Sequence, residues 1–182
     1  QKLVTTCNRI HHHCSVATST FRCAHRKPNL AQVPSDERFR QLFTATPSKQ
    51  MVSADLSGIE LRMLAHYLSR YDNGRYQRIL TTGDIHQTNA ERIGITRRQV
   101  KTVTYAFLYG AGDAKLGYSF DKQLTEIDAR KKGNEIRKAY VAAIPGLAEL
   151  LQACQIRSKR GYAMSIDGRR ISVDKGHKFL NY

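Results

Sequence analysis

Apolar residues recur with helical spacing in the middle of the chain. Ile59, Met63, Leu64, Tyr67 and Leu68 fall on one side of a helix, so this stretch predicts an amphipathic helix. The helix should stop at the Tyr-Asp-Asn-Gly run that follows, because Asn and Gly favour turns.

Two further helices begin at capping residues. Asp84 is a typical N-cap and predicts a helix that runs to Gly94. Thr96, with Gln99 three residues later, has the spacing of a capping box, in which each side chain bonds the backbone N–H of the other residue. The helix that Thr96 opens should end near Gly110.

The C-terminal third predicts helices and a hairpin. Amphipathic helices are expected at about 125–143 and 147–159, with a Pro-Gly pair between them. Residues 163–166 and 169–173 then flank an Asp-Gly pair, which is the strongest signal for a two-residue β-hairpin loop.

The first fifty residues are polar and irregular, and they predict mostly extended chain with a short helix near 36–43. Residues 51–54, Met-Val-Ser-Ala, predict a short buried strand that ends at Asp55. The expected fold class is therefore α+β and mostly helical.

Composition and charge narrow the function. The chain has 182 residues, 41% of them hydrophobic, and no apolar run approaches the roughly 20 residues that span a bilayer. Its four cysteines are too few for a disulfide framework at this length, so we expect reduced thiols. With 30 Lys and Arg against 15 acids, the net charge of +15 favours a polyanionic partner, nucleic acid first. A merely soluble basic surface is the alternative.

The helix after Thr96 carries candidate chemistry. Arg97, Lys101 and Tyr105 recur every four residues and so lie along one face over about 12 Å. An extended nucleoside triphosphate has about this reach, with cations on its phosphates and a ring near its sugar and base. A solvated basic stripe that ends in a packed tyrosine is the alternative.

Two acids that precede that helix are candidate site residues. Asp55, at the end of the predicted strand, is placed to bind Mg²⁺, which takes one or two carboxylates together with substrate phosphates. A helix-capping role is the alternative for Asp55, although Ser57 is better placed for it. Ser57 and Glu60 also have capping-box spacing, which would leave Glu60 no further role.

These residues resemble the family A DNA polymerases, the bacterial polymerase I-like group. Residues 55–62, Asp-Leu-Ser-Gly-Ile-Glu-Leu-Arg, resemble motif A, and residues 97–110 resemble motif B. Residues 28–34, Pro-Asn-Leu-Ala-Gln-Val-Pro, resemble the primer-template segment that precedes motif A. In amino-acid sequence these motifs are most similar to the polymerases of T-odd phages. The matching motifs follow the family's order and cover about residues 9–182.

The resemblance implies a role for each residue of the nucleotide site. Arg97, Lys101 and His86 would bind the incoming dNTP, and Lys101 would protonate the departing pyrophosphate. Tyr105 would stack near the new base pair. Glu60 would lie under the sugar, hydrogen-bonded to Tyr105, and would select deoxyribose.

The resemblance also implies metal and DNA ligands. Asp55 would hold two Mg²⁺ ions, with the Leu56 carbonyl as a further ligand. The implied contacts to primer-template DNA come from the segment before motif A and from the end of motif B: Arg22, Asn29, Gln32, Tyr109 and Gly110.

The implied architecture is a partial polymerase right hand, palm entry plus fingers. A primer-template-contacting segment would take residues 1–50, a palm portion with motif A residues 51–83, and fingers with motif B and the hairpin residues 84–182. The implied function is template-directed nucleotidyl transfer from dNTPs in DNA replication, in the cytoplasm of a bacterium or a phage-infected cell. The implied partners are primer-template DNA, dNTPs, the remainder of the polymerase and a processivity factor.

One family feature is missing. None of the seven histidines is followed by an acid, whereas the family's second catalytic carboxylate lies in a His-Asp motif. We therefore expect a partial chain that is inactive alone. The alternatives are a noncatalytic nucleic-acid-binding fragment and a single-subunit RNA polymerase, against which Glu60 argues. Phe21 also stands where the family has glycine.

Histidines and cysteines near the N-terminus raise the possibility of zinc. Their spacing has no C-x₂₋₄-C pair, so the sequence favours a fortuitous polar cluster over a structural metal. The residues concerned are Cys7, His11, His12, His13, Cys14 and Cys23.

Overall fold

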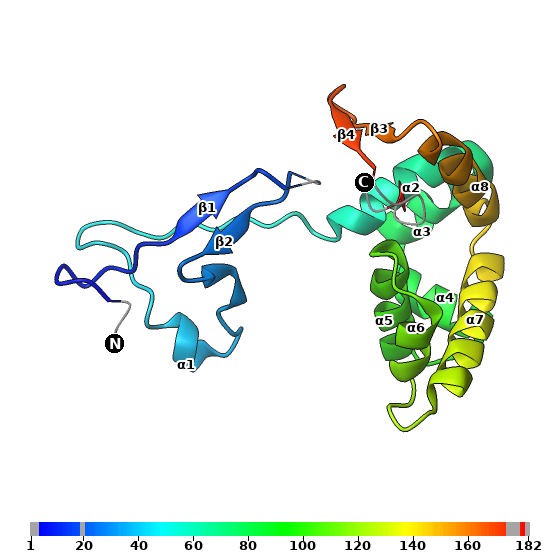
Figure 1. Ribbon diagram of the computed structural model, residues 1–182, viewed down its shortest axis with the longest axis horizontal. Helices are drawn as coiled ribbons and strands as arrows, with labels where there is room; N and C mark the ends of the chain where they lie inside the picture. Colours follow the sequence, from blue (N-terminus) through cyan, green and yellow to red (C-terminus); the bar gives the residue numbers. More distant parts are fainter. Residues whose placement is uncertain (1–3, 19–20, 174–178, 181–182) are drawn as a thin grey trace. The chain divides into compact units, whose positions relative to one another are not determined.

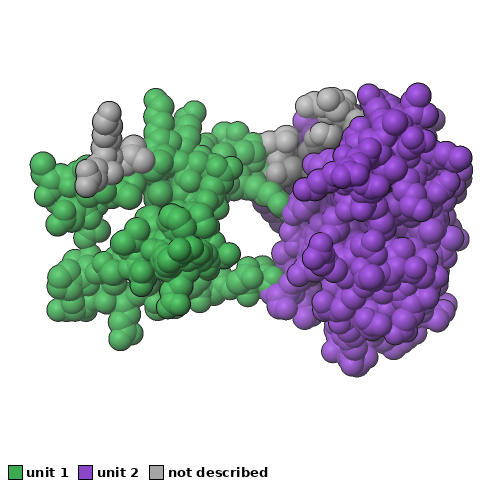
Figure 2. Space-filling view, turned by 90° about the horizontal axis from the view of Figure 1, so that it is seen from below, with its two compact units in different colours: residues 1–56 green, residues 57–182 purple. Residues whose placement is uncertain are grey.

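The computed structural model describes residues 4–18, 21–173 and 179–180, and their chain path is drawn in Figure 1. The chain forms two compact units, residues 1–56 and 57–182, coloured separately in Figure 2. The described residues form mostly helices with four short strands, so the predicted α+β, mostly helical class is confirmed. Residues 57–83 pack into one unit with the rest of the chain that follows, and the functional boundaries at 50 and 83 stay predictions.

The first unit is built on a small hairpin. Strand β1 (His13–Ser15) pairs antiparallel with β2 (Ala24–Arg26). The short 3₁₀ helix η1 (Leu30–Gln32) follows, and then α1 (Glu37–Arg40), which Asp36 caps by accepting a hydrogen bond from the Arg38 backbone N–H. The predicted helix near 36–43 is therefore present but shorter.

The strand predicted at residues 51–54 is wrong. These residues have no regular secondary structure and are exposed, with Val52 93% accessible, and they belong to no described strand. A strand persists only when a neighbour pairs with its backbone, and the four described strands pair only as β1–β2 and β3–β4. Asp55 thus follows an exposed segment and not a buried strand.

Helices dominate the second unit, and the five that apolar spacing and caps predict are confirmed within about two residues. Two further helices, α3 and α6, are not predicted. The bounds are α2 (Ile59–Asp72), α3 (Arg75–Thr82), α4 (Ile85–Ile93), α5 (Arg97–Leu108), α6 (Asp113–Tyr118), α7 (Glu126–Ala143) and α8 (Leu147–Ser158).

The turn between α2 and α3 explains why a second helix follows so soon. Asn73 and Gly74 both adopt positive φ, which ends α2. The Asp72 carboxylate accepts hydrogen bonds from the backbone N–H groups of Gly74, at 2.8 Å, and Tyr76, at 2.7 Å. The turn that the sequence predicts is therefore also the start of a helix.

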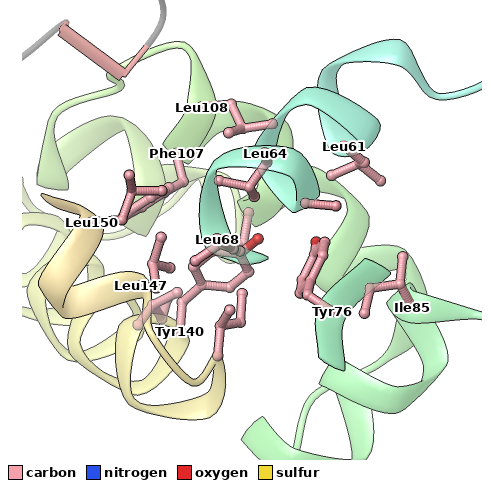
Figure 3. Packing of buried hydrophobic residues seen from close by; sticks show 14 of the residues in the cluster. Leu61, Leu64, Leu68, Tyr76, Ile85, Phe107, Leu108, Tyr140, Leu147 and Leu150 are labelled. Carbon is pink, nitrogen blue, oxygen red and sulfur yellow. The ribbon is translucent and has the colours of Figure 1, made fainter. Parts of the chain in front are cut away.

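The core gathers side chains from most of these helices. Leu61, Leu64 and Leu68 lie on one side of α2 and belong to the same buried cluster as Tyr140 and Leu147, and all five are labelled in Figure 3. The stripe predicted from the sequence is confirmed in part: Leu64 and Leu68 are buried, Met63 and Tyr67 are half-buried, and Ile59 is exposed. Leu61 and Ala65 complete the buried face. No single described helix is long and apolar enough to cross a membrane. The α7–α8 pair has the required length and composition only when the two helices are taken together, and they are bent by 109° relative to each other.

The α6–α7 contact depends on two glycines. A Cβ placed on Gly133 would lie 1.8 Å from the Asp113 backbone oxygen, and one on Gly117 would lie 2.0 Å from that of Ala129. Backbone atoms cannot move away as the end of a flexible side chain can. The two helices therefore approach so closely that neither position admits even alanine.

The C-terminal hairpin pairs β3 (Tyr162–Met164) with β4 (Arg170–Ser172). Its loop has three residues and not the predicted two, because Ser165 N–H bonds the Arg169 carbonyl across residues 166–168. Gly168 is the last residue of a turn in which its N–H donates to the Ser165 carbonyl, and its φ is 82°. This is the turn-plus-bulge form of hairpin, which also needs Gly at its last loop position.

We expect Gly133→Ala to lower the free energy of unfolding by about 2 kcal/mol or more, because the added methyl overlaps backbone of α6. Thermal or urea unfolding followed by circular dichroism would measure the change. Gly112→Ala is the matched control, since its Cβ meets nothing within 4 Å. Equal stability of the two variants would contradict the close α6–α7 contact.

Candidate functional site

The start of α5 is fixed by its cap. The Thr96 backbone N–H donates to Gln99 Oε1 at 2.9 Å, and the Gln99 N–H donates to Thr96 Oγ1 at 3.3 Å. The predicted capping box is therefore confirmed. It makes Arg97 the first helical residue, where the N-terminal end of the helix dipole favours anions.

The two faces of α5 differ in character. One face is buried and carries Val100, Val103, Thr104, Phe107 and Leu108. On the other side Arg97 and Lys101 are exposed and Tyr105 is half-buried. The row of two cations and a ring that the sequence predicts is thus accessible to a ligand.

A carboxylate holds the first cation of this row. Arg97 Nε donates to Asp84 Oδ2 at 2.6 Å, while Asp84 Oδ1 accepts from the backbone N–H groups of His86 and Gln87 at the start of α4. The Arg97 bond is the main reason that the pKa of Asp84 lies below its usual value. Both side chains are about half exposed, so the pair contributes little stability and mainly orients the guanidinium.

His86, on α4, lies beside this row of residues on α5. The centroids of the His86 and Tyr105 rings lie 6.3 Å apart, with 47° between the ring planes. His86 Nδ1 is buried and has no hydrogen-bond partner within the described chain. Partial burial lowers the pKa of His86, Asp84 opposes this, and the charges of Arg97 and Lys101 lower it further.

The structure thus brings together four residues that the sequence assigns to the nucleotide: His86, Arg97, Lys101 and Tyr105. A neutral imidazole, two cations and a phenol on adjacent helices can bind an elongated anion that carries a ring at one end. Asp84 is the member that sequence reasoning missed as a site residue, because it was identified only as a cap.

Glu60 takes a partner that the resemblance does not imply. Tyr109 Oη, just beyond the end of α5, donates to Glu60 Oε1 at 2.9 Å, whereas the implied partner is Tyr105. The alternative reading of Ser57 and Glu60 as a capping box is wrong, because α2 begins after Gly58, which has φ of 58° and makes no side-chain cap. The Glu60 carboxylate is therefore directed to α5 and not to its own helix end.

Asp55 and Leu56 lie at the end of the first unit, and both are exposed. A carboxylate and a backbone carbonyl are oxygen ligands of the kind that Mg²⁺ prefers. Asp55 belongs to no group of three His, Cys, Asp or Glu side chains that converge among the described residues. These donors therefore fit a metal ion that is also held by substrate phosphates, and not a site closed by protein ligands alone.

Three of the predicted DNA contacts fall on and beside η1 and the β1–β2 hairpin, and the other two, Tyr109 and Gly110, follow α5. Asn29 Oδ1 accepts from the Ala31 backbone N–H at 3.1 Å, so part of its side chain caps η1, while Gln32 is exposed at the other end. Arg22 is exposed and follows Phe21, whose φ of 56° is the backbone conformation that glycine adopts most easily. Gly110, with φ of 66°, turns the chain after α5.

Comparison with known proteins identifies the family. The sequence profile of DNA polymerase family A matches residues 1–178, and the chain belongs to this family. It is 34% identical to the DNA-directed DNA polymerases of Enterobacteria phage T3 and Escherichia phage T7, over 89% of the chain and 26% of each relative. DNA polymerase I of Rhizobium leguminosarum is 29% identical over 90% of the chain and 17% of that protein.

A solved structure has the same fold. The POL domain of Pol1 from M. smegmatis, in complex with DNA primer-template and dNTP, aligns with a TM-score of 0.72 and 24% identity, over 99% of this chain and 35% of that one. The chain spans about a quarter of the length of the two phage relatives. The family resemblance seen in motifs A and B is confirmed.

The charges around His86 predict how its pKa responds to substitution. Lys101→Ala removes a cation that lowers the pKa, so the pKa should rise, and Asp84→Asn removes the opposing anion, so the pKa should fall. NMR titration of the imidazole would measure both shifts. Lys159→Ala, the same charge change at the end of α8, should leave the His86 pKa unchanged, and shifts of equal size in all three variants would contradict the assignment.

Proposed function

We propose that this chain carries the dNTP-binding part of a DNA-directed DNA polymerase, and that it acts in template-directed DNA synthesis. The observation that carries the proposal is the row formed by Arg97, Lys101 and Tyr105 on the exposed side of α5, with His86 beside it. Membership of DNA polymerase family A supports it. The partners we infer are primer-template DNA, dNTPs and the remaining segments of the polymerase; a processivity factor stays a prediction.

The phosphates of the dNTP would bind at the start of α5. Arg97, oriented by Asp84, presents a planar guanidinium that suits phosphate oxygens, and Lys101 adds a second cation one turn later. In the reaction the primer 3′-hydroxyl loses its proton to solvent and its oxygen bonds the α-phosphorus, while the bond from the α-phosphorus to the oxygen that bridges to the β-phosphate breaks. Lys101 then gives its proton to the pyrophosphate that leaves, while Arg97 stabilises the growing charge.

The sugar would meet Glu60. Tyr109 holds one carboxylate oxygen at 2.9 Å, which limits the positions that Glu60 can take. The 2′-hydroxyl of a ribonucleotide would clash with the Glu60 carboxylate or compete for its hydrogen bond with Tyr109. A deoxyribonucleotide has no 2′-hydroxyl and would do neither. This arrangement favours a DNA polymerase over the single-subunit RNA polymerase alternative.

The metal and DNA contacts complete the proposal. Asp55 and the Leu56 carbonyl would hold Mg²⁺, which activates the attacking oxygen and stabilises the leaving group when it is bound. The net charge of +15 favours DNA, and Arg22, Asn29 and Gln32 would contact primer-template backbone and groove edges. The M. smegmatis structure of the same fold holds DNA primer-template and dNTP.

A noncatalytic nucleic-acid-binding fragment is the second candidate. It is favoured by the charge of +15 together with the single carboxylate, Asp55, that is assigned to the two metal ions, because one carboxylate makes a poor two-metal site. It would keep DNA affinity without dNTP chemistry. A substitution that separates the two properties therefore distinguishes the candidates.

Lys101→Ala makes this separation. In the polymerase that contains this chain, we expect kcat/KM for dNTP incorporation to fall about a hundredfold or more, because the leaving pyrophosphate loses a charged donor. Primer extension would measure the rate, and fluorescence anisotropy would measure DNA affinity, which should stay nearly unchanged. Arg98→Ala, one residue from Arg97 on α5 and outside the row of Arg97, Lys101 and Tyr105, is the matched control. A wild-type rate in Lys101→Ala would refute the proposal.

Tyr109→Phe tests the sugar contact. The substitution removes the hydrogen bond from Tyr109 to Glu60, so the preference for dNTP over rNTP, taken as the ratio of kcat/KM values, should fall about tenfold. The same ratio measured for Tyr105→Phe shows which tyrosine acts. Loss of discrimination in Tyr105→Phe alone would support the partner that the resemblance implies and contradict the one in this structure.

A further inference from the structure

The β1–β2 hairpin places three metal-ligating side chains on one face. Cys14 and His25 are directly opposite each other in the antiparallel register, so their side chains point to the same side. Cys23 precedes His25 by two residues in the neighbouring stretch of chain, and alternation along an extended chain puts it on that side as well. His13 precedes Cys14 in β1, and His12 lies directly before the strand.

Distances agree with the register. Cys14 Sγ and Cys23 Sγ lie 3.2 Å apart, and one ligand atom from each of Cys14, Cys23 and His25 falls within 4.8 Å of the others. His25 Nδ1 is buried and has no hydrogen-bond partner in the part of the chain that the structure describes. The His12 ring stacks on His25, with centroids 5.1 Å apart and 18° between the planes, which helps to orient it.

The unit that contains this hairpin lacks a core. None of its described residues is buried, and each of its two strands has three residues. A two-stranded hairpin of this size is marginally stable in water, and small units without a hydrophobic core commonly depend on a metal or a disulfide. The unit therefore has both a need for a cross-link and side chains that can form one.

We propose that Cys14, Cys23 and His25 bind a zinc ion. Two thiolates and an imidazole are the ligands that Zn²⁺ favours, and they differ from the oxygen ligands that Mg²⁺ takes, so this site is separate from Asp55. Three protein ligands leave one tetrahedral position, which water fills in open zinc sites. A fortuitous polar cluster, which the spacing favours, does not account for the common face and the short distances.

The ion would close the loop between the two strands. It links β1 to Cys23, which directly follows Arg22, and to His25 in β2. Given the proposed function, the zinc would fix the backbone that carries a DNA-contacting arginine. The metal site itself requires no polymerase activity, so its test does not depend on that function.

Metal binding to the purified 182-residue chain tests the proposal. Under a non-thiol reductant, we expect one Zn²⁺ per chain by native mass spectrometry, and Co²⁺ in its place should show thiolate charge-transfer bands and the visible absorption of a tetrahedral site. Cys14→Ser and His25→Ala should each weaken Zn²⁺ binding by more than about a hundredfold, because loss of an outer-shell partner alone costs about 10–100-fold. Far-ultraviolet circular dichroism of the helices shows whether each variant still folds.

Two controls match these variants. His13→Ala removes a neighbouring histidine whose side chain alternates to the other face, and Cys7→Ser removes a thiol outside the cluster; both should bind Zn²⁺ like the wild type. Absence of stoichiometric binding, an equal loss in His13→Ala, or a Cys14–Cys23 disulfide that persists under reductant and excludes Zn²⁺ would each overturn the proposal. A zinc-binding chain whose polymerase shows no dNTP incorporation would refute the proposed function alone.

Discussion

Burial of one face of α5 decides where the cations of the other face can lie. Val100 and Val103 are fully buried, and Tyr140 Oη donates to Thr104 Oγ1 at 3.0 Å inside the core. Any rotation of the helix about its axis would expose these valines, break a buried hydrogen bond and move Lys101 toward apolar side chains. Each of these changes costs free energy, so the packed side holds the ligand-facing side in register.

The helices that the sequence predicts are those whose signals are local. α2 and α5 have long apolar repeats, and α4 and α5 have capping side chains within a few residues of their first turns. The two missed helices, α3 and α6, have eight and six residues, too few for a clear repeat. The placement of α6 depends on contact with distant chain, through its close approach to Gly133 on α7.

The residues of the candidate site also divide into those that a local pattern predicts and those that depend on contacts between elements. Arg97, Lys101 and Tyr105 could be predicted because a single helix sets their spacing. The bonds from Arg97 to Asp84 and from Tyr109 to Glu60 join residues on different elements, and no periodicity predicts such pairs. The strand expected at 51–54 is wrong for a related reason, because β-pairing depends on a partner that the segment itself does not specify. The Cys14–Cys23–His25 group likewise becomes visible only once the hairpin register is known.

The ion pair between Asp84 and Arg97 also bears on ligand choice under the proposed function. An arriving phosphate must compete with a carboxylate that already occupies one edge of the guanidinium, at 2.6 Å. A triphosphate has several anionic oxygens and can engage Lys101 at the same time, whereas a singly charged anion replaces one ion pair with another of similar strength. Asp84 thereby acts as a resident counterion, and it favours polyvalent ligands over inorganic anions of low charge.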